Sequence, residues 1–235
     1  MTELLVAKDI SAGYHGHPIV HDLNLTVNAG EVTVLLGPNG AGKTTTLLTL
    51  SGDLPQLEGE VWLDGKVTKA PLHRRAHAGL SFVTEERSVF MRLSVAENLR
   101  VGRTDVDRAL ELFPELRPLL RRRAGLLSGG EQQMLSLARA LSRRPKILLI
   151  DELSLGLAPL VVVRLLDAVQ RAAHDEGVGV LLVEQHVKQA LRVADEVLVM
   201  QRGEIVLRGK VDEVGSRLDD LEAAYLSAHP DRPLD

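Results

Sequence analysis

The chain has 235 residues, of which 45% are hydrophobic and 26% are charged, so it is long enough for an α/β domain with an aliphatic core. Its net charge of −4 lacks the basic excess of a nucleic-acid-binding groove, and nucleic acid is not an expected partner. Cysteine is absent, which excludes disulfides and thiolate metal sites and is typical of a reducing compartment. No apolar run approaches the roughly 20 residues that span a bilayer, and we expect no signal peptide.

The first third of the chain is expected to be rich in strands. Strand-like apolar patterns predict strands over 4–10, 23–27 and 61–66, and a β-branched and aliphatic run predicts another over 32–36. A helix is expected over 44–50, because this stretch contains no helix breaker. The segment therefore predicts antiparallel strands around the loop that joins the strand over 32–36 to this helix.

That loop matches the phosphate-binding pattern G-x-x-x-x-G-K-[ST] at every fixed position. It consists of Gly37, Pro38, Asn39, Gly40, Ala41, Gly42, Lys43 and Thr44. The glycines let backbone N–H groups turn toward phosphates, while Lys43 reaches the β/γ oxygens and the Thr44 hydroxyl is suited to Mg²⁺. The alternative is an ordinary Gly-rich turn, but the order of strand, loop and helix favours a nucleoside triphosphate site.

The middle of the chain changes to a helical pattern. Helices are expected over 95–101, 106–113 and 131–141, with a proline-interrupted basic stretch before the last of them. Ser128 and Glu131 have the spacing of a capping box at the start of the third helix. This helix start is a candidate second anion site, although a plain capped helix explains the same spacing.

The last third alternates strands with helices, which predicts a parallel sheet with its ligand at the strand C-termini. The expected elements are strands over 147–150, 178–183 and 196–200, helices over 160–174 and 187–194, a hairpin at 202–203, and an acidic helix over 211–227 followed by a polar tail.

Two carboxylates, Asp151 and Glu152, close the strand over 147–150. This order suits an acid that holds Mg²⁺, followed by a base that polarises the attacking water. The alternative is a pair of solvated acids, which the phosphate loop in the same chain makes less favoured.

The order of the motifs resembles that of ABC-family ATP-binding cassettes over nearly the whole chain. The motifs are the phosphate loop, Leu127-Ser128-Gly129-Gly130-Glu131, Asp151-Glu152, Ser154-Leu155-Gly156-Leu157-Ala158-Pro159 and His186. The resemblance implies an α/β fold of the P-loop NTPase class, with a RecA-like parallel sheet core, an antiparallel β subdomain and an inserted helical signature subdomain. It implies one ATP-binding domain over 1–235, with its core at about 1–90 and 143–235, the helical subdomain at about 91–142, and a tail at about 228–235.

Matching positions imply roles for single residues. The catalytic roles are those of Glu152 as general base, His186 as γ-phosphate sensor and Lys43 as phosphate contact. The implied ATP contacts are Tyr14, which would stack on adenine, Gly37, Pro38, Asn39, Gly40, Ala41, Gly42, Lys43, Thr44, Thr45, Ser128, Gly129, Gly130 and Glu131. The implied Mg²⁺ contacts are Thr44, Asp151 and Glu85. A Tyr14 that packs over a turn and a His186 that starts a surface helix are the alternatives at these two positions.

In the family, two cassettes meet head to tail, so the signature residues of one copy serve the ATP of the other. Ser128 and Gly130 would therefore act in trans, and the segment Ser154 to Pro159 matches the dimer-contact loop. Both halves of one site are not expected to come from one copy.

Two positions depart from the family pattern. Glu85 stands where most cassettes have glutamine, and Leu153 stands where they have proline, which would loosen the turn while the base is kept. Glu85, together with the motifs around Gln132 and Gln185, resembles the branched-chain amino-acid importer cassettes, and the match is nearest to the shorter of their two cassettes.

The resemblance thus implies an ATP-hydrolysing subunit of an importer for branched-chain or other hydrophobic amino acids. The expected partners are membrane-spanning permease subunits at the cytoplasmic face of the membrane, a second cassette and, indirectly, a substrate-binding protein; the expected cofactors are ATP and Mg²⁺. Two alternatives remain, namely a soluble ABC-type ATPase in protein or cofactor assembly and a regulatory module that binds nucleotide without hydrolysis.

Overall fold

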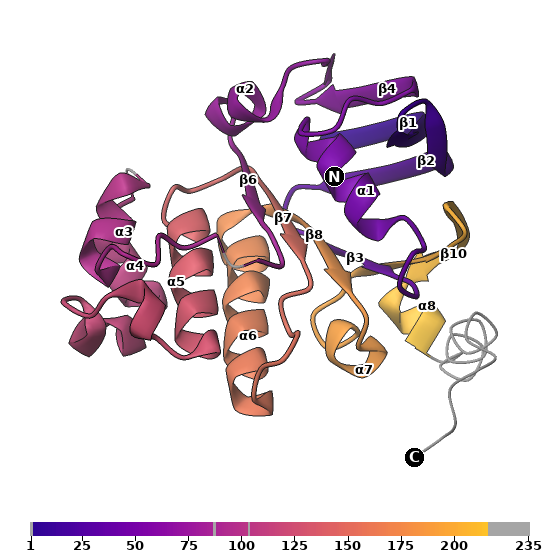
Figure 1. The fold of residues 1–235 in the computed structure, drawn as a ribbon. Coiled ribbons are helices and arrows are strands. Elements are labelled where there is room, and N and C mark those ends of the chain that lie inside the picture. Colours follow the sequence, from indigo (N-terminus) through magenta and orange to yellow (C-terminus); the bar gives the residue numbers. More distant parts are fainter. Residues whose placement is uncertain (1, 87, 103, 216–235) are drawn as a thin grey trace.

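The computed structural model describes residues 2–86, 88–102 and 104–215, which form two sheets and the helices that cover them (Figure 1). The smaller sheet has the strand order β2-β1-β4-β5, and all its neighbours are antiparallel. Its strands are β1 (Glu3–Tyr14), β2 (His17–Asn28), β4 (Glu58–Leu63) and β5 (Lys66–Val67). The expected antiparallel part is therefore present, but β1 and β2 are longer than predicted. Bulges interrupt their register, so the alternation is regular over only part of each strand.

The larger sheet has the order β10-β9-β3-β8-β7-β6 and is parallel except for the hairpin partner β10. Its strands are β3 (Val32–Leu36), β6 (Leu80–Val83), β7 (Ile147–Asp151), β8 (Gly179–Glu184), β9 (Glu196–Gln201) and β10 (Glu204–Lys210). Parallel pairing brings the C-terminal residues of three neighbouring strands, Leu36, Glu184 and Asp151, to one edge of the sheet. This edge is where a ligand is expected in such a sheet.

Helix α1 (Lys43–Ser51) lies between the two sheets (Figure 1). Its Leu47 and Leu50 are fully buried in a core that contains Leu25 of the small sheet and Leu149 of the large one. The opposite face of the large sheet is covered by α5 (Gly129–Leu141) and α6 (Pro159–Glu176), which share a second core with it. The phosphate loop thus leads into a helix that is held on both sides.

The helical segment comprises α3 (Val95–Val101), α4 (Val106–Leu112), the 3₁₀ turns η1 (Pro114–Leu119) and η2 (Ala124–Leu126), and α5. The 3₁₀ turn η1 contains both prolines of the proline-interrupted stretch, Pro114 and Pro118. Arg164 joins this segment to α6, because it donates to a Glu115 carboxylate oxygen at 2.8 Å and stacks over the Phe113 ring.

The remaining helices are α2 (Leu72–His77), α7 (Val187–Ala190) and α8 (Val211–Gly215). The prediction of a helix over 187–194 was too long: α7 ends at Ala190, because the chain turns so that the Asp195 N–H reaches the Val32 carbonyl and β9 begins. Only residues 211–215 of the predicted acidic helix are described; its remainder and the tail lie outside the described residues. In the described part of the chain, no helix has both the length and the apolar character needed to cross a membrane.

Helix α2 carries a buried arginine that stabilises α1. The Arg75 guanidinium, which is 2% exposed as a residue, donates to the carbonyls of Leu50 at 2.7 Å, Thr49 at 3.2 Å and Ala70 at 2.7 Å. We expect Arg75→Ala to lower the free energy of unfolding by about 3 kcal/mol, because buried carbonyls in the last turn of α1 lose a charged donor. Urea denaturation measures this loss. The matched control is Arg74→Ala, since Arg74 is exposed on the same helix; equal stability of both variants would contradict the assignment.

Candidate nucleotide-binding site

A cavity of about 510 Å³ lies at the C-terminal edge of the large sheet. The phosphate loop and the start of α1 form one wall through Asn39, Gly40, Gly42, Lys43, Thr44 and Thr45. The other wall comes from the turns after β6, β7 and β8, which contribute Glu85, Glu152, Leu155 and Gln185. Residues that are far apart in the sequence therefore meet around one space of a size suited to a small ligand.

The phosphate loop has a backbone that depends on glycine at two positions. Gly42 has a φ of 108° in the left-handed region and precedes α1 directly. A Cβ at Gly37 would lie 2.5 Å from the Met200 carbonyl oxygen of β9, so the loop is packed closely against that strand. The start of α1, with its unpaired N–H groups, consequently faces the cavity as an anion site.

Lys43 closes this loop from within. Its ammonium donates to the carbonyls of Gly37 at 2.8 Å and Pro38 at 3.0 Å, and the residue is only 5% exposed. Burial lowers the pKa of Lys43, while the carboxylates of Glu152 and Asp151 act in the opposite direction. An ammonium has three donors, so one remains for a phosphate oxygen.

Asp151 ends β7 beside the start of α1. Its Oδ1 is buried and has no hydrogen-bond partner among the described residues, while the Thr44 hydroxyl donates to the same carboxylate. Burial is the main cause that raises the pKa of Asp151 to about 6. A buried carboxylate oxygen without a partner is suited to a cation, directly or through water.

Glu152 follows with a φ of 48°, a left-handed conformation that is uncommon outside glycine. Its N–H donates to the Val183 carbonyl at 3.0 Å, and its side-chain Oε1 accepts a hydrogen bond from the Gln185 amide. Leu153, one of the two predicted departures from the pattern of the resembled family, is 1% exposed and belongs to the core beneath α5 and α6. The turn is therefore anchored by a buried side chain.

The other predicted site residues divide into two groups. Glu85 lines the cavity, whereas the exposed His186, two residues after the end of β8, is not among the residues that line it. Tyr14 is 43% exposed at the end of β1, where it pairs with His17, and it is not among the residues that line the cavity. The structure thus brings the phosphate loop, Asp151, Glu152 and Glu85 together.

The predicted ATP contacts of the signature lie at the start of α5 and do not line the cavity; they are Ser128, Gly129, Gly130 and Glu131. The predicted capping box is confirmed: the Ser128 N–H donates to Glu131 Oε2 at 2.7 Å, and the Glu131 N–H donates to Ser128 Oγ at 3.3 Å. A Cβ at Gly130 would lie 2.9 Å from a methyl carbon of Val161 in α6, so this glycine also has a packing role. Gly129 is the first residue of the helix.

Sequence reasoning missed Glu184 and Gln185 as site residues. Glu184 is 1% exposed and bonds Ser154, and Gln185 bonds Glu152. One signal was available: β8, like β7, is an aliphatic run that ends in a carboxylate. The sequence does not reveal the use of this carboxylate, because its contact with Ser154 requires β7 and β8 to be neighbours in the sheet.

Comparison with known proteins agrees with this geometry. Residues 20–154 match the family described as ABC transporter. The chain is 40% identical over 214 residues to the high-affinity branched-chain amino acid transport ATP-binding protein BraG of Pseudomonas aeruginosa, a match that covers 87% of this chain and 91% of BraG. It is 37% identical over 222 residues to the lipopolysaccharide export system ATP-binding protein LptB of Escherichia coli K12, which covers 89% and 92% of the two chains.

Solved structures have the same fold. An ATP-binding subunit of an ABC transporter superposes with a TM-score of 0.81 at 26% identity, covering 95% of this chain and 99% of that one. A cassette solved as a dimer with ADP and phosphate superposes with a TM-score of 0.80 at 23% identity, covering 88% and 99%. The α/β P-loop NTPase fold predicted from the sequence is thereby confirmed.

Proposed function

Because this chain belongs to the ABC transporter family and is one of its ATP-binding ATPase subunits, we propose that it energises uptake of branched-chain or other hydrophobic amino acids through membrane-spanning partners. The observation that carries the substrate class is the 40% identity to BraG over 87% of the chain. The intact constellation of Lys43, Asp151 and Glu152 supports hydrolysis rather than nucleotide binding alone.

In this proposal the phosphate loop and the start of α1 hold the triphosphate. Backbone N–H groups at 39, 40 and 42–44 and the free donor of Lys43 bind the β- and γ-phosphate oxygens, and Tyr14 stacks on the adenine. The exposure of Tyr14 supports the stacking role, because its ring is accessible at the end of the β1–β2 hairpin.

The residues at the end of β7 fit Mg²⁺. The unpartnered Asp151 Oδ1 and the Thr44 hydroxyl would hold it, with Glu85 near enough to act electrostatically on Asp151. The ion would offset negative charge on the phosphates. The described residues contain no cluster of three His, Asp and Glu side chains that could hold a metal ion, and Mg²⁺ in phosphate sites commonly takes only one or two carboxylates.

Hydrolysis is assigned to residues of the turns after β7 and β8. Glu152 accepts a proton from the attacking water, and the Gln185 amide, which donates to Glu152 Oε1, fixes the direction of that carboxylate. His186 contacts the γ-phosphate. The backbone at Glu152 is fixed for this role, because its N–H donates to the Val183 carbonyl and the neighbouring Leu153 side chain is buried.

The working form in this proposal is a head-to-tail dimer with a second cassette. The signature at the start of α5 does not line the cavity of its own chain, so it would complete the site of the partner. Leu155 and Leu160, which are 44% and 85% exposed around the start of α6, are apolar groups that a partner would cover. Membrane-spanning permeases, an associated substrate-binding protein and a position at the cytoplasmic face of the membrane follow from the same proposal.

Lipopolysaccharide export is a second candidate, because the 37% identity to LptB is nearly the same as that to BraG. The two candidates share ATP hydrolysis and membrane-spanning partners, and they differ in the transported compound. The cavity described above is the proposed ATP site and does not contact the transported compound. It therefore does not discriminate between the two candidates.

An uptake experiment tests the substrate class. Native cells that lack the chain are expected to lose uptake of radiolabelled leucine, isoleucine or valine, and the wild-type chain, but not Glu152→Gln, should restore it. Unchanged uptake of all three, together with a defect in lipopolysaccharide at the cell surface, would replace the importer by the export candidate.

Purification from native membranes in mild detergent with ATP tests the partners. The importer proposal expects two polytopic proteins and a second cassette, identified by mass spectrometry. Good recovery with soluble partners only would favour the alternative of a soluble assembly ATPase.

A further inference from the structure

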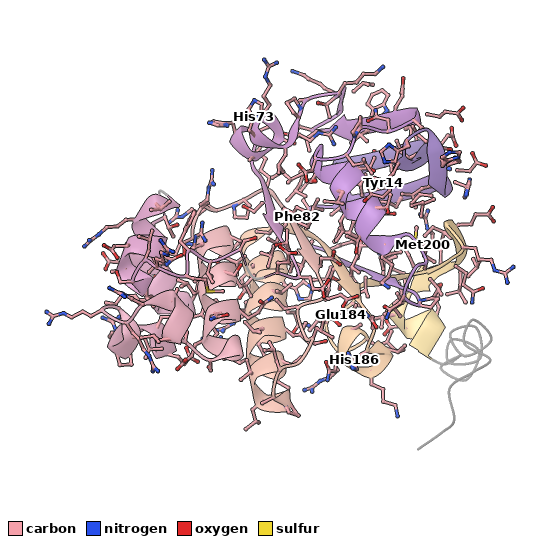
Figure 2. All side chains as sticks on the ribbon, viewed as in Figure 1. Tyr14, His73, Phe82, Glu184, His186 and Met200 are labelled. Atoms are coloured by element: carbon pink, nitrogen blue, oxygen red, sulfur yellow. The ribbon has the colours of Figure 1, made fainter. Side chains whose placement is uncertain are left out.

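The last residue of β8 reaches across to the turn after β7. Glu184 Oε2 accepts a hydrogen bond from the Ser154 hydroxyl at 2.8 Å, and Oε1 accepts one from the Ser154 N–H at 3.0 Å. The same hydroxyl oxygen lies 3.3 Å from Nδ1 of His186. Glu184 and His186 lie near each other at the C-terminal end of β8 (Figure 2). A buried carboxylate, a hydroxyl and an imidazole thus form a chain of contacts, and their sequence neighbours Leu155 and Gln185 line the nucleotide cavity.

Two of the three groups, Glu184 and Ser154, are buried, and this burial strengthens the effect of the hydrogen bonds between them. Glu184 is 1% exposed and Ser154 is 5% exposed, so water does not readily replace either partner. Burial raises the pKa of Glu184, while hydrogen bonds from Ser154 act in the opposite direction. Loss of the Ser154 contacts would leave a buried carboxylate with fewer donors, which is costly.

The direction of the hydrogen bonds follows from the number of protons. An ionised carboxylate only accepts, so the single hydroxyl proton of Ser154 points to Glu184. The hydroxyl oxygen then offers a lone pair to His186, which is satisfied when Nδ1 carries a proton. The other imidazole nitrogen, Nε2, remains for contact with a ligand.

We infer that Glu184, acting through the Ser154 hydroxyl, is a positioning residue that fixes the tautomer and the orientation of His186. The catalytic consequence rests on the γ-phosphate role proposed above for His186, whereas the tautomer itself does not. Glu184 and Ser154 touch no substrate atom in this account; they determine which imidazole nitrogen faces the phosphate. The effect resembles that of groups that orient a metal-bound histidine by a hydrogen bond to its other ring nitrogen.

Nitrogen NMR of the full chain with ¹⁵N-labelled histidine tests the tautomer directly. At about pH 8.5, where an ordinary imidazole is neutral, the His186 signal, assigned by its loss in His186→Asn, should show a proton on Nδ1. Ser154→Ala removes the acceptor, and Glu184→Gln places an amide donor against the hydroxyl, which then donates to Nδ1. Both variants are expected to shift the proton to Nε2. A wild-type signal with the proton on Nε2, or variants without a shift, would overturn the inference.

Matched controls separate this effect from loss of a buried group. Ser142→Ala removes another buried hydroxyl, which donates to the Ala138 carbonyl at 2.6 Å far from His186 in sequence, and Glu31→Gln neutralises a carboxylate that bonds Asn28. Neither control should move the His186 signal. A shift in these variants would mean that the signal reports general destabilisation and would count against the inference.

ATP turnover tests the catalytic consequence. Ser154→Ala and Glu184→Gln are expected to lower kcat about tenfold with KM for ATP changed less than twofold. In the His186→Ala background the same substitutions should have no further effect, because the residue that they position is absent. A full further loss in that background would show a merely structural role.

The inference and the proposed function fail in different ways. If Glu152→Gln leaves turnover intact, the proposed hydrolytic role fails, while the NMR result still decides the tautomer. If turnover depends on Glu152 and His186 but the tautomer does not depend on Glu184 or Ser154, only the positioning role fails.

Discussion

Glu152→Gln is expected to lower steady-state ATP turnover by about 10²- to 10⁴-fold, the range for loss of a general base. The amide has nearly the shape of the carboxylate but does not accept a proton from water. The backbone N–H of residue 152 still donates to the Val183 carbonyl, and Leu153 remains buried. The turn and the fold should therefore be retained. ATP binding should be preserved, because the substitution also removes a negative charge that acts on Asp151.

The same variant should accumulate as an ATP-bound dimer, since closure without hydrolysis has no route to reopening. Turnover is measured by phosphate release, and the dimer by size-exclusion chromatography with light scattering. The control is Glu86→Gln, which alters an exposed neighbour of Glu85 outside the cavity lining. It should retain wild-type turnover, and its ATP-bound dimer should dissociate as the wild-type dimer does. Wild-type turnover in Glu152→Gln would refute its assignment as the base.

Lys43→Met should weaken binding of ATP with Mg²⁺ by about two orders of magnitude, which is the scale of one lost hydrogen bond between charged groups. Methionine retains an apolar stem in this buried position, so the loss is that of the ammonium. The variant also leaves the carbonyls of Gly37 and Pro38 without their donor, which loosens the loop that must wrap the phosphates.

Isothermal titration calorimetry with ATP and Mg²⁺ measures this effect, and the thermal midpoint shows whether the fold is kept. Lys146→Met is the matched control, because Lys146 is an exposed lysine whose partner is Asp64 rather than the phosphate loop. An affinity within threefold of the wild type in Lys43→Met would show that phosphate binding does not depend on this residue.

Local patterns predicted the parts of the site that one short segment builds. The phosphate loop, the carboxylates Asp151 and Glu152, and the capping box of Ser128 and Glu131 each depend on spacing within a few residues. Their physical requirements, namely glycine conformations, a strand end and a helix start, are visible in the residue types themselves.

Features that require two distant segments were missed or misjudged. Helix α2 has little apolar periodicity, so the sequence did not predict it. It is attached to the end of α1 by Arg75, which donates to the carbonyls of Thr49 and Leu50, and no local pattern shows this contact. The contact between Glu184 and Ser154 needs β7 and β8 to be neighbours in the sheet. The early end of α7 likewise results from the start of β9 rather than from a helix breaker.

The left-handed backbone of Glu152 has a consequence for how this position tolerates change under selection. Glycine and asparagine adopt a φ of 48° at lower cost than glutamate, so the residue with the proposed proton-accepting role occupies a conformation that favours other residue types. In a library of variants sorted for thermal resistance alone, glycine or asparagine should become enriched here, whereas sorting for growth that depends on transport should retain glutamate. Deep sequencing of both pools would then show different residues enriched at position 152. This difference would show that thermal stability and ATP turnover favour different residues at this position.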